Sequence, residues 1–78
     1  MENLVAYLAK ALVEQPDDVV TTRVEKGGET AIELRVNPKD MGKVIGKQGR
    51  VAKSIRTLVK AAAAKEGKHI RYSVDIIE

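Results

Sequence analysis

Two glycines, Gly46 and Gly49, stand between a short apolar segment and a long amphipathic one, and this spacing constrains the chain more than any other feature. Glycine adopts backbone angles that side chains forbid, so a Gly-x-x-Gly sequence favours a tight turn whose N–H groups face a ligand. A helix that begins after the second glycine points its positive end at the same place. The sequence Gly46-Lys47-Gln48-Gly49 therefore predicts a phosphate-gripping loop, to which Arg50 adds a positive charge.

The segment after the glycines has the clearest periodicity in the chain. Its apolar residues fall within an arc of roughly 140° on a helix, so we expect a helix over residues 50–65 that buries them. They are Val51, Ala52, Ile55, Leu58, Val59, Ala62 and Ala63. The alanine run at residues 61–64 leaves two interpretations open, because alanine favours helices on its own and also permits a flat protein contact.

The amino-terminal segment predicts a second amphipathic helix, over residues 2–14. Its apolar residues lie within roughly 120° of one another at helical periodicity, while the charged residues fall elsewhere. The apolar residues are Leu4, Val5, Leu8, Ala11 and Leu12. The run is interrupted by Lys10 and is far shorter than the ~18 residues of a membrane span, so we expect neither a membrane span nor a signal peptide.

Two strands are expected between these helices. Residues 19–26 are rich in β-branched side chains, Gly27-Gly28 suits a turn, and residues 30–36 alternate between apolar and polar. This pattern predicts a β-hairpin. Its second strand places Ile32, Leu34 and Val36 on one face, which we expect helices to cover.

A short helix and a third strand complete the pattern. Asp40 is suited to cap a helix that begins near Met41, with Met41, Val44 and Ile45 on its buried side. Residues 70–76 alternate again, beginning with Ile70, and predict a strand. Two helices connect this strand to the one at residues 30–36, so the two strands are expected to be parallel neighbours.

The order of elements is therefore α-β-β-α-α-β. We expect one domain over residues 1–78, of class α+β, with a three-stranded mixed sheet covered on one face by three helices. A domain of this size has a modest core. Since the chain contains no cysteine, its stability must come from packing.

This order, together with the sequence Val44-Ile45-Gly46-Lys47-Gln48-Gly49 and Ile55 six residues further on, resembles the type II KH domains of bacteria. The resemblance covers essentially the whole chain, and at this length it is to the small bacterial KH domain protein A family. One departure is Ala52, where many KH domains have a large aliphatic residue, so we expect a groove that is shallower or is filled from elsewhere. The resemblance implies an RNA-binding protein and RNA chaperone that influences cell-wall growth and cell length.

The resemblance also implies a binding site, since KH domains clamp about four nucleotides of single-stranded RNA between a glycine loop and an apolar groove. Residues of the loop would contact phosphate and sugar, and nearby cations would attract the backbone. The expected RNA-binding residues are Lys43, Val44, Ile45, Gly46, Lys47, Gln48, Gly49, Arg50 and Lys53. Of these, Val44 and Ile45 would line the groove with Val36, although all three are equally suited to the core.

The charge distribution points to a polyanion independently of the family. Residues 39–60 contain seven basic residues and one acidic residue, whereas the overall net charge is only +3. A basic block of this kind is typical of nucleic-acid-binding surfaces, although a solvated helix face has the same signature. Arg56 and Lys60 lie furthest from the loop and are expected to be solvated. Aromatic residues make up 3% of the chain, so base stacking on aromatic side chains is not expected.

Nothing in the sequence favours catalysis. The single histidine, His69, is expected at the surface where a strand begins, and the chain has no cysteine. The carboxylates are scattered among basic residues, so no nucleophile–base pair, metal site or cofactor site is predicted. We expect a cytoplasmic binding protein.

One alternative remains open at this stage. In it the chain is a protein-interaction module, forming a homodimer or a heterodimer with a larger, Jag-like KH protein, and its contact with RNA is secondary. A small domain with a modest core gains stability from such an interface.

Overall fold

The computed structural model describes residues 1–66 and 71–77. Its main elements are α1 (Glu2–Leu12), β1 (Val20–Lys26), β2 (Glu29–Arg35), α2 (Met41–Ile45), α3 (Arg50–Lys65) and β3 (Arg71–Ile77). Short 3-10 turns lie at Pro16–Asp18, Pro38–Asp40 and Lys47–Gly49. The predicted order of helices and strands is confirmed, with ends displaced by one or two residues. The predictions for His69 and Ile70 concern residues outside those that the structure describes.

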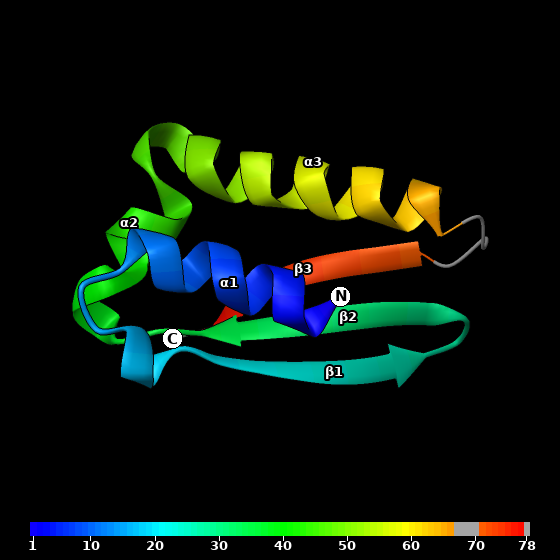
Figure 1. The fold of residues 1–78 in the computed structure, drawn as a ribbon, viewed down its shortest axis with the longest axis horizontal. Coiled ribbons are helices and arrows are strands. Elements are labelled where there is room, and N and C mark those ends of the chain that lie inside the picture. The colour runs from blue at the N-terminus through cyan, green and yellow to red at the C-terminus, as the bar shows by residue number, and fades with distance from the viewer. Residues whose placement is uncertain (67–70, 78) are drawn as a thin grey trace.

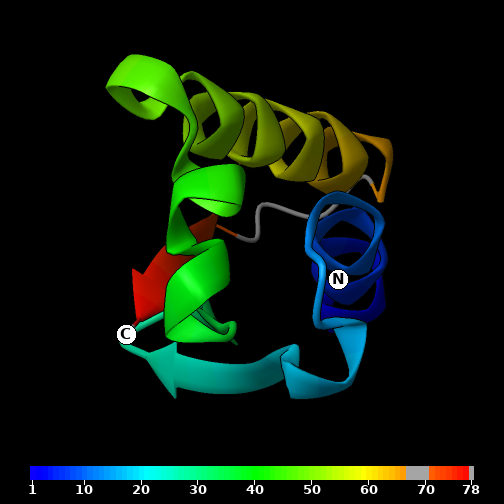
Figure 2. The same cartoon turned by 90° about the vertical axis from the view of Figure 1, so that its left-hand side faces the viewer.

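The sheet has the order β1-β2-β3, with β2 in the centre. β1 and β2 are antiparallel, as the pair Arg23↔Ile32 illustrates, and β2 and β3 are parallel, with Ile32 opposite Val74. Figures 1 and 2 show the helices on one side of this sheet, with α1 and α3 running over it and α2 at one end. The predicted α+β fold with a mixed sheet is therefore confirmed.

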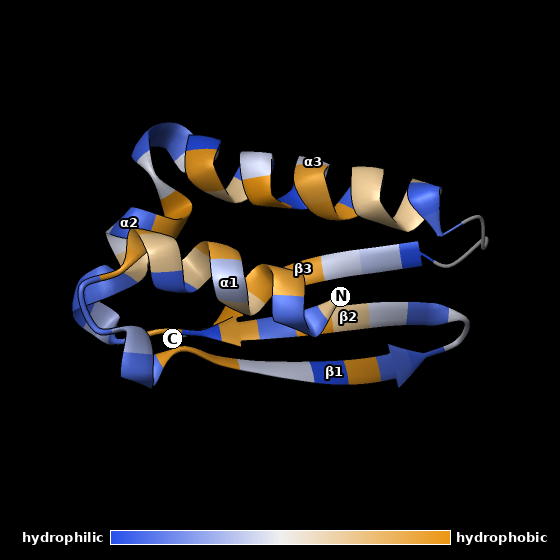
Figure 3. Ribbon diagram, in the orientation of Figure 1, coloured by the Kyte–Doolittle hydropathy of each residue, from blue (hydrophilic) through white to orange (hydrophobic). Residues whose placement is uncertain are grey.

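The core lies between the sheet and the helices. The strand face predicted to be buried is confirmed, since Ile32 and Leu34 are fully buried and Val36 is 6% exposed. Apolar and polar residues alternate along each helix in Figure 3, as expected for helices that cover a sheet. The other buried apolar residues are Val5, Ala9, Val19, Val44, Ala52, Ile55, Val59, Ala63 and Val74.

Four apolar residues predicted to lie on the buried sides of their helices are exposed: Ala11, Leu12, Ile45 and Leu58. Leu12 is 40% exposed, Leu58 49% and Ile45 36%. A helix on a sheet buries a stripe narrower than the arcs drawn from the sequence, and residues at the edge of an arc remain outside. Ile45 follows the fully buried Val44, and neighbouring helical residues point about 100° apart.

The predicted cap at Asp40 is wrong in its details. Asp40 does precede α2, but its side chain makes no capping bond to that helix. Its carboxylate instead accepts backbone N–H bonds from Glu14 and Gln15, at 3.2 and 3.0 Å. These N–H groups follow the end of α1, and the Asp40 side chain is almost fully buried there. Asp40 thus fastens the end of α1 to the start of α2.

Candidate nucleic-acid interface

The segment 46–49, here called the glycine loop, turns the chain from α2 into α3 at one end of the molecule (Figure 1). Three of its residues have positive φ: Gly46 (76°), Gln48 (58°) and Gly49 (73°). Two backbone bonds close the turn, from the Gly46 N–H to Gly42 O at 2.8 Å and from the Gly49 N–H to Gly46 O at 3.2 Å. The predicted tight turn is thus formed, and Lys47 and Gln48 lie exposed at its tip.

The two glycines are needed for different reasons. A Cβ atom at Gly46 would lie 2.8 Å from Val51 Cβ and 2.9 Å from Val51 N, so the residue lacks space as well as having positive φ. A Cβ atom at Gly49 would meet nothing within 4 Å, so only its φ of +73° disfavours a side chain. Val51 therefore fills the space beside the loop, and the next residue, Ala52, is buried.

The amino-terminal end of α3 carries positive charge without an internal counter-charge. Gly49 precedes the helix and supplies no side-chain cap, and the first turn contains no acidic residue. Arg50 and Lys53 lie exposed near this end. Cations at the positive end of a helix dipole are unfavourable, so an anion bound here would relieve repulsion and also meet free backbone N–H groups.

The predicted cations differ in their partners. Lys43 Nζ lies 3.3 Å from Glu14 Oε1 and 3.6 Å from Asp40 Oδ1, so two carboxylates already neutralise it. Within the described part of the chain, no ion pair involves Lys47, Arg50 or Lys53. The latter three are therefore better placed than Lys43 to attract a phosphate.

The same contacts lower the pKa of the Asp40 carboxyl group. Burial alone would raise the pKa of its carboxyl group, but the N–H donors of Glu14 and Gln15 and the ammonium of Lys43 outweigh burial and lower the pKa. Asp40 is therefore ionised at neutral pH, and its charge holds Lys43 at the base of α2.

The three residues predicted to line the apolar groove differ in how far they are buried. Val44 is fully buried and Val36 is 6% exposed, so both side chains belong to the core. Ile45 is 36% exposed and remains accessible next to the glycine loop. Among the predicted groove residues, Ile45 is thus the one whose side chain can meet a base.

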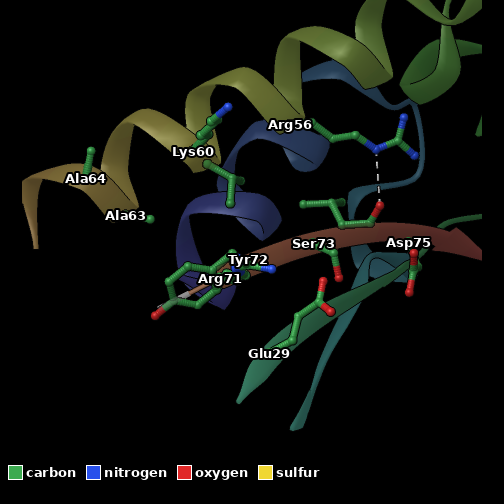
Figure 4. A pocket seen from close by; sticks show the side chains of 11 residues that line it. Glu29, Arg56, Lys60, Ala63, Ala64, Arg71, Tyr72, Ser73 and Asp75 are labelled. Carbon is green, nitrogen blue, oxygen red and sulfur yellow. Dashed lines mark hydrogen bonds between the residues drawn. The ribbon is translucent and has the colours of Figure 1, made fainter. Parts of the chain in front are cut away.

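One feature of the structure was missed by the sequence analysis. A cleft of about 670 Å³ lies between α3 and β3, lined in part by Arg56, Lys60 and Tyr72 (Figure 4). Arg56 is not simply solvated, because its Nε atom donates to Val74 O at 3.3 Å. The available signal was that Arg56 and Lys60 follow Lys53 at intervals of three and four residues, which places all three on one side of a helix.

The described residues contain neither a metal-site arrangement nor a membrane-spanning helix. In residues 1–66 and 71–77, no group of three or more His, Cys, Asp or Glu side chains has the arrangement of a metal site. Over the same residues, no helix is long and apolar enough to span a membrane.

Comparison with known proteins adds sequence relatives. Residues 2–76 match the family model described as KhpA/KhpB, KH domain. The "RNA-binding protein KhpA" of Clostridium perfringens is 56% identical over 70 residues, covering 90% of this chain and 93% of the relative. The protein of the same name in Halalkalibacterium halodurans is 51% identical over 78 residues, covering 100% of each chain.

Solved structures with the same fold are more distant in sequence. A variant of Era from Aquifex aeolicus superimposes with a TM-score of 0.70 at 20% identity, covering 96% of this chain and 29% of that one. Era in complex with MgGDPNP and nucleotides of 16S ribosomal RNA gives a TM-score of 0.60 at 20% identity, covering 97% of this chain and 30% of that one. At 20% identity these superpositions show only that the fold is shared.

Proposed function

Because the chain belongs to the KhpA/KhpB family of KH domains, we propose that it binds single-stranded RNA and holds the RNA backbone with the glycine loop. The observation that carries this proposal is the exposed, positive-φ loop at the uncapped start of α3, next to three cations that lack ion-pair partners in the described chain. Relatives covering nearly all of the chain are named RNA-binding proteins, which supports the same ligand.

The roles within the site follow from the geometry. Backbone N–H groups of the loop and of the first turn of α3 meet a phosphate, and Lys47, Arg50 and Lys53 neutralise it and its neighbours. Ile45 offers an apolar surface to a base. Val44 supports Ile45 and the loop from within the core, and Lys43 contributes more to fixing α2 than to attracting RNA. Phosphate contacts position the strand without reading its sequence.

Single-strand preference is part of the proposal. KH-type grooves accept splayed, unpaired bases, which a duplex does not offer. About four phosphate contacts give a slope near −3 in log K against log salt concentration, at ~0.7 per contact for single strands. Titrating labelled single-stranded and duplex RNA at several salt concentrations tests this. Equal affinity for both RNAs, or an affinity insensitive to salt, would contradict it.

The wider role is inferred from the family resemblance. An RNA chaperone in the cytoplasm, without enzymatic activity, fits a small domain that holds RNA mainly by its backbone. In that role the protein would act after transcription on messages for cell-wall growth and so influence cell length. Deletion of the gene, followed by measurement of cell length and of RNA recovered with the tagged protein, tests this role.

A second candidate function is protein association, as a homodimer or with a larger, Jag-like KH protein. The observation that favours it is a set of exposed apolar side chains on α1 and α3: Tyr7 is 71% exposed, Leu12 40% and Leu58 49%. The alanine run is less suited to this role than its sequence indicated, because Ala63 is packed into the core. Light scattering of the wild type and of Leu58→Gln tests this candidate, and a monomeric wild type would exclude the homodimer.

A further inference from the structure

The side chain of Glu14 pairs with a lysine that stands next to the glycine loop. Glu14 Oε1 lies 3.3 Å from Lys43 Nζ. Lys43 belongs to the last turn of α2, and the residue before it, Gly42, accepts the hydrogen bond from the Gly46 N–H. Lys43 is therefore about one helical turn from the loop, and its long, flexible side chain can reach an RNA strand that the loop holds.

The two carboxylates that pair with Lys43 differ in how firmly they are held. The Asp40 side chain is 2% exposed, lies 3.6 Å from Lys43 Nζ and accepts two backbone N–H bonds. The Glu14 side chain is 74% exposed, and among residues 1–66 and 71–77 it has no observed partner besides Lys43. Exposed ion pairs contribute little free energy, so another anion can displace Glu14 from Lys43 but cannot displace Asp40.

The fold itself places Glu14 beside Lys43. The Glu14 N–H donates to Asp40 Oδ1 at 3.2 Å, and the same oxygen lies 3.6 Å from Lys43 Nζ. A single buried oxygen atom thus brings together two residues that are far apart in sequence. Asp17 is a nearby acid of the same connection and is also exposed, but it makes no ion pair within the described chain.

We infer that Glu14 is an affinity-determining residue, an internal competitor that an RNA phosphate displaces from Lys43. In the free protein Glu14 neutralises Lys43, and in the complex a phosphate takes its place while the Glu14 side chain turns to solvent. This exchange offsets much of the gain from the Lys43 contact, so RNA binds more weakly and dissociates faster than from a site with an unpaired lysine. The inference rests on the proposed function and assigns to the segment after α1 a part in it.

The test removes the charge of Glu14 and keeps its size. In Glu14→Gln, the affinity for a single-stranded RNA should rise about two- to fivefold at low salt, the worth of one exposed ion pair. The slope of log K against log salt concentration should become steeper by ~0.7, as expected for one added phosphate contact. The matched control is Asp17→Asn, which makes the same change in net charge and should leave the slope unchanged. Melting curves of the same preparations establish that each variant is folded.

A second variant shows whether the gain passes through Lys43. Lys43→Ala combined with Glu14→Gln should bind RNA with the affinity and the salt slope of Lys43→Ala alone, because no lysine is left to release. A gain that persists in this double variant would overturn the inference, as would equal effects of Glu14→Gln and Asp17→Asn. A wild type that binds no single-stranded RNA would contradict the proposed function, and the inference with it.

Discussion

The carboxylate of Asp40 accepts a hydrogen bond from the backbone N–H of Gln15 at 3.0 Å, across 25 positions of the sequence. A second bond from the Glu14 N–H, at 3.2 Å, completes the contact, and the side chain is almost fully buried. Asp40 begins the segment that leads through α2 to the glycine loop. The position of the proposed RNA site therefore depends on a buried charge fastened to the end of α1.

Replacing Asp40 should destabilise the fold. Asp40→Ala leaves two backbone N–H groups without their acceptor in a place that water reaches poorly, and we expect the melting temperature to fall by roughly 10 °C. Asp40→Asn keeps one acceptor oxygen and should have a smaller effect. Thermal melts followed by circular dichroism measure both, with the exposed Asp17→Asn as the control. An Asp40→Ala melt equal to that of the wild type would contradict the role of this contact.

The same residue predicts an acid-dependent loss of stability. Folding lowers the pKa of Asp40, so its stabilisation is complete above the unfolded-state pKa of about 3.9 and disappears as pH falls through the lower, folded-state value. Denaturant midpoints measured from pH 6 to pH 2 should therefore fall less steeply for Asp40→Asn than for the wild type. Parallel pH profiles for the two proteins would contradict the assigned cause.

The glycines should respond unequally to substitution. Gly49→Ala introduces a side chain at positive φ without a clash and should lower stability by about 1 kcal/mol. Gly46→Ala adds a clash with Val51 to the same strain and should lower stability by more, about 3 kcal/mol. Gly42→Ala is the control, because this glycine lies inside α2 with open space around it and should tolerate alanine. Chemical denaturation ranks the three, and equal effects at positions 46 and 49 would contradict the crowding by Val51.

Two lysines close to each other in sequence, Lys43 and Lys47, should differ in how much they contribute to the salt dependence of RNA binding. Lys47→Ala removes a cation without an observed ion pair, and the salt slope should become shallower by ~0.7. Lys43→Ala removes a cation held by Glu14 and Asp40, so the slope should hardly change. RNA titrations over a range of salt concentrations distinguish them. Equal changes in slope would show that the ion pairs of Lys43 do not shield it.

Much of the fold could be predicted because its main signals are local. The periodicity of residues 50–65 and the alternation at residues 30–36 each report which face is buried, and both patterns recur in the structure. The exposure of Leu58 could not be predicted, since the width of the buried stripe depends on how closely neighbouring elements pack. The partners of Asp40 could not be predicted either, because they lie about 25 residues away in sequence.

The candidate site was predictable to a similar extent. The spacing of Gly46 and Gly49 predicted a turn, and the structure forms it with the expected positive φ values. The division of the cations into paired and unpaired ones depends on a tertiary contact between Glu14 and Lys43, for which neither residue carries a local signal. The cleft beside Tyr72 likewise needs α3 and β3 placed against each other.

The central claim, that the glycine loop holds RNA, predicts a loss of binding without a loss of folding. The double variant Lys47→Asp, Gln48→Asp keeps both glycines and reverses the sign of the electrostatic field at the tip of the loop. Aspartate tolerates the left-handed backbone of Gln48, and acids near the start of α3 are favourable to its dipole, so the fold should be unchanged. The control is Asn3→Asp with Lys10→Asp, which makes the same change in net charge at two exposed positions of α1.

The decisive measurement is the affinity of these two double variants and the wild type for one single-stranded RNA, at a single salt concentration, together with their melting curves. We predict that the loop variant melts like the wild type, whereas the α1 variant remains folded but melts slightly lower, because Lys10→Asp places an acid in the last turn of α1. The α1 variant should bind RNA within a few-fold of the wild type, and the loop variant should lose at least about tenfold in affinity through like-charge repulsion. A loop variant that remains folded and binds RNA as tightly as the α1 variant would contradict the account.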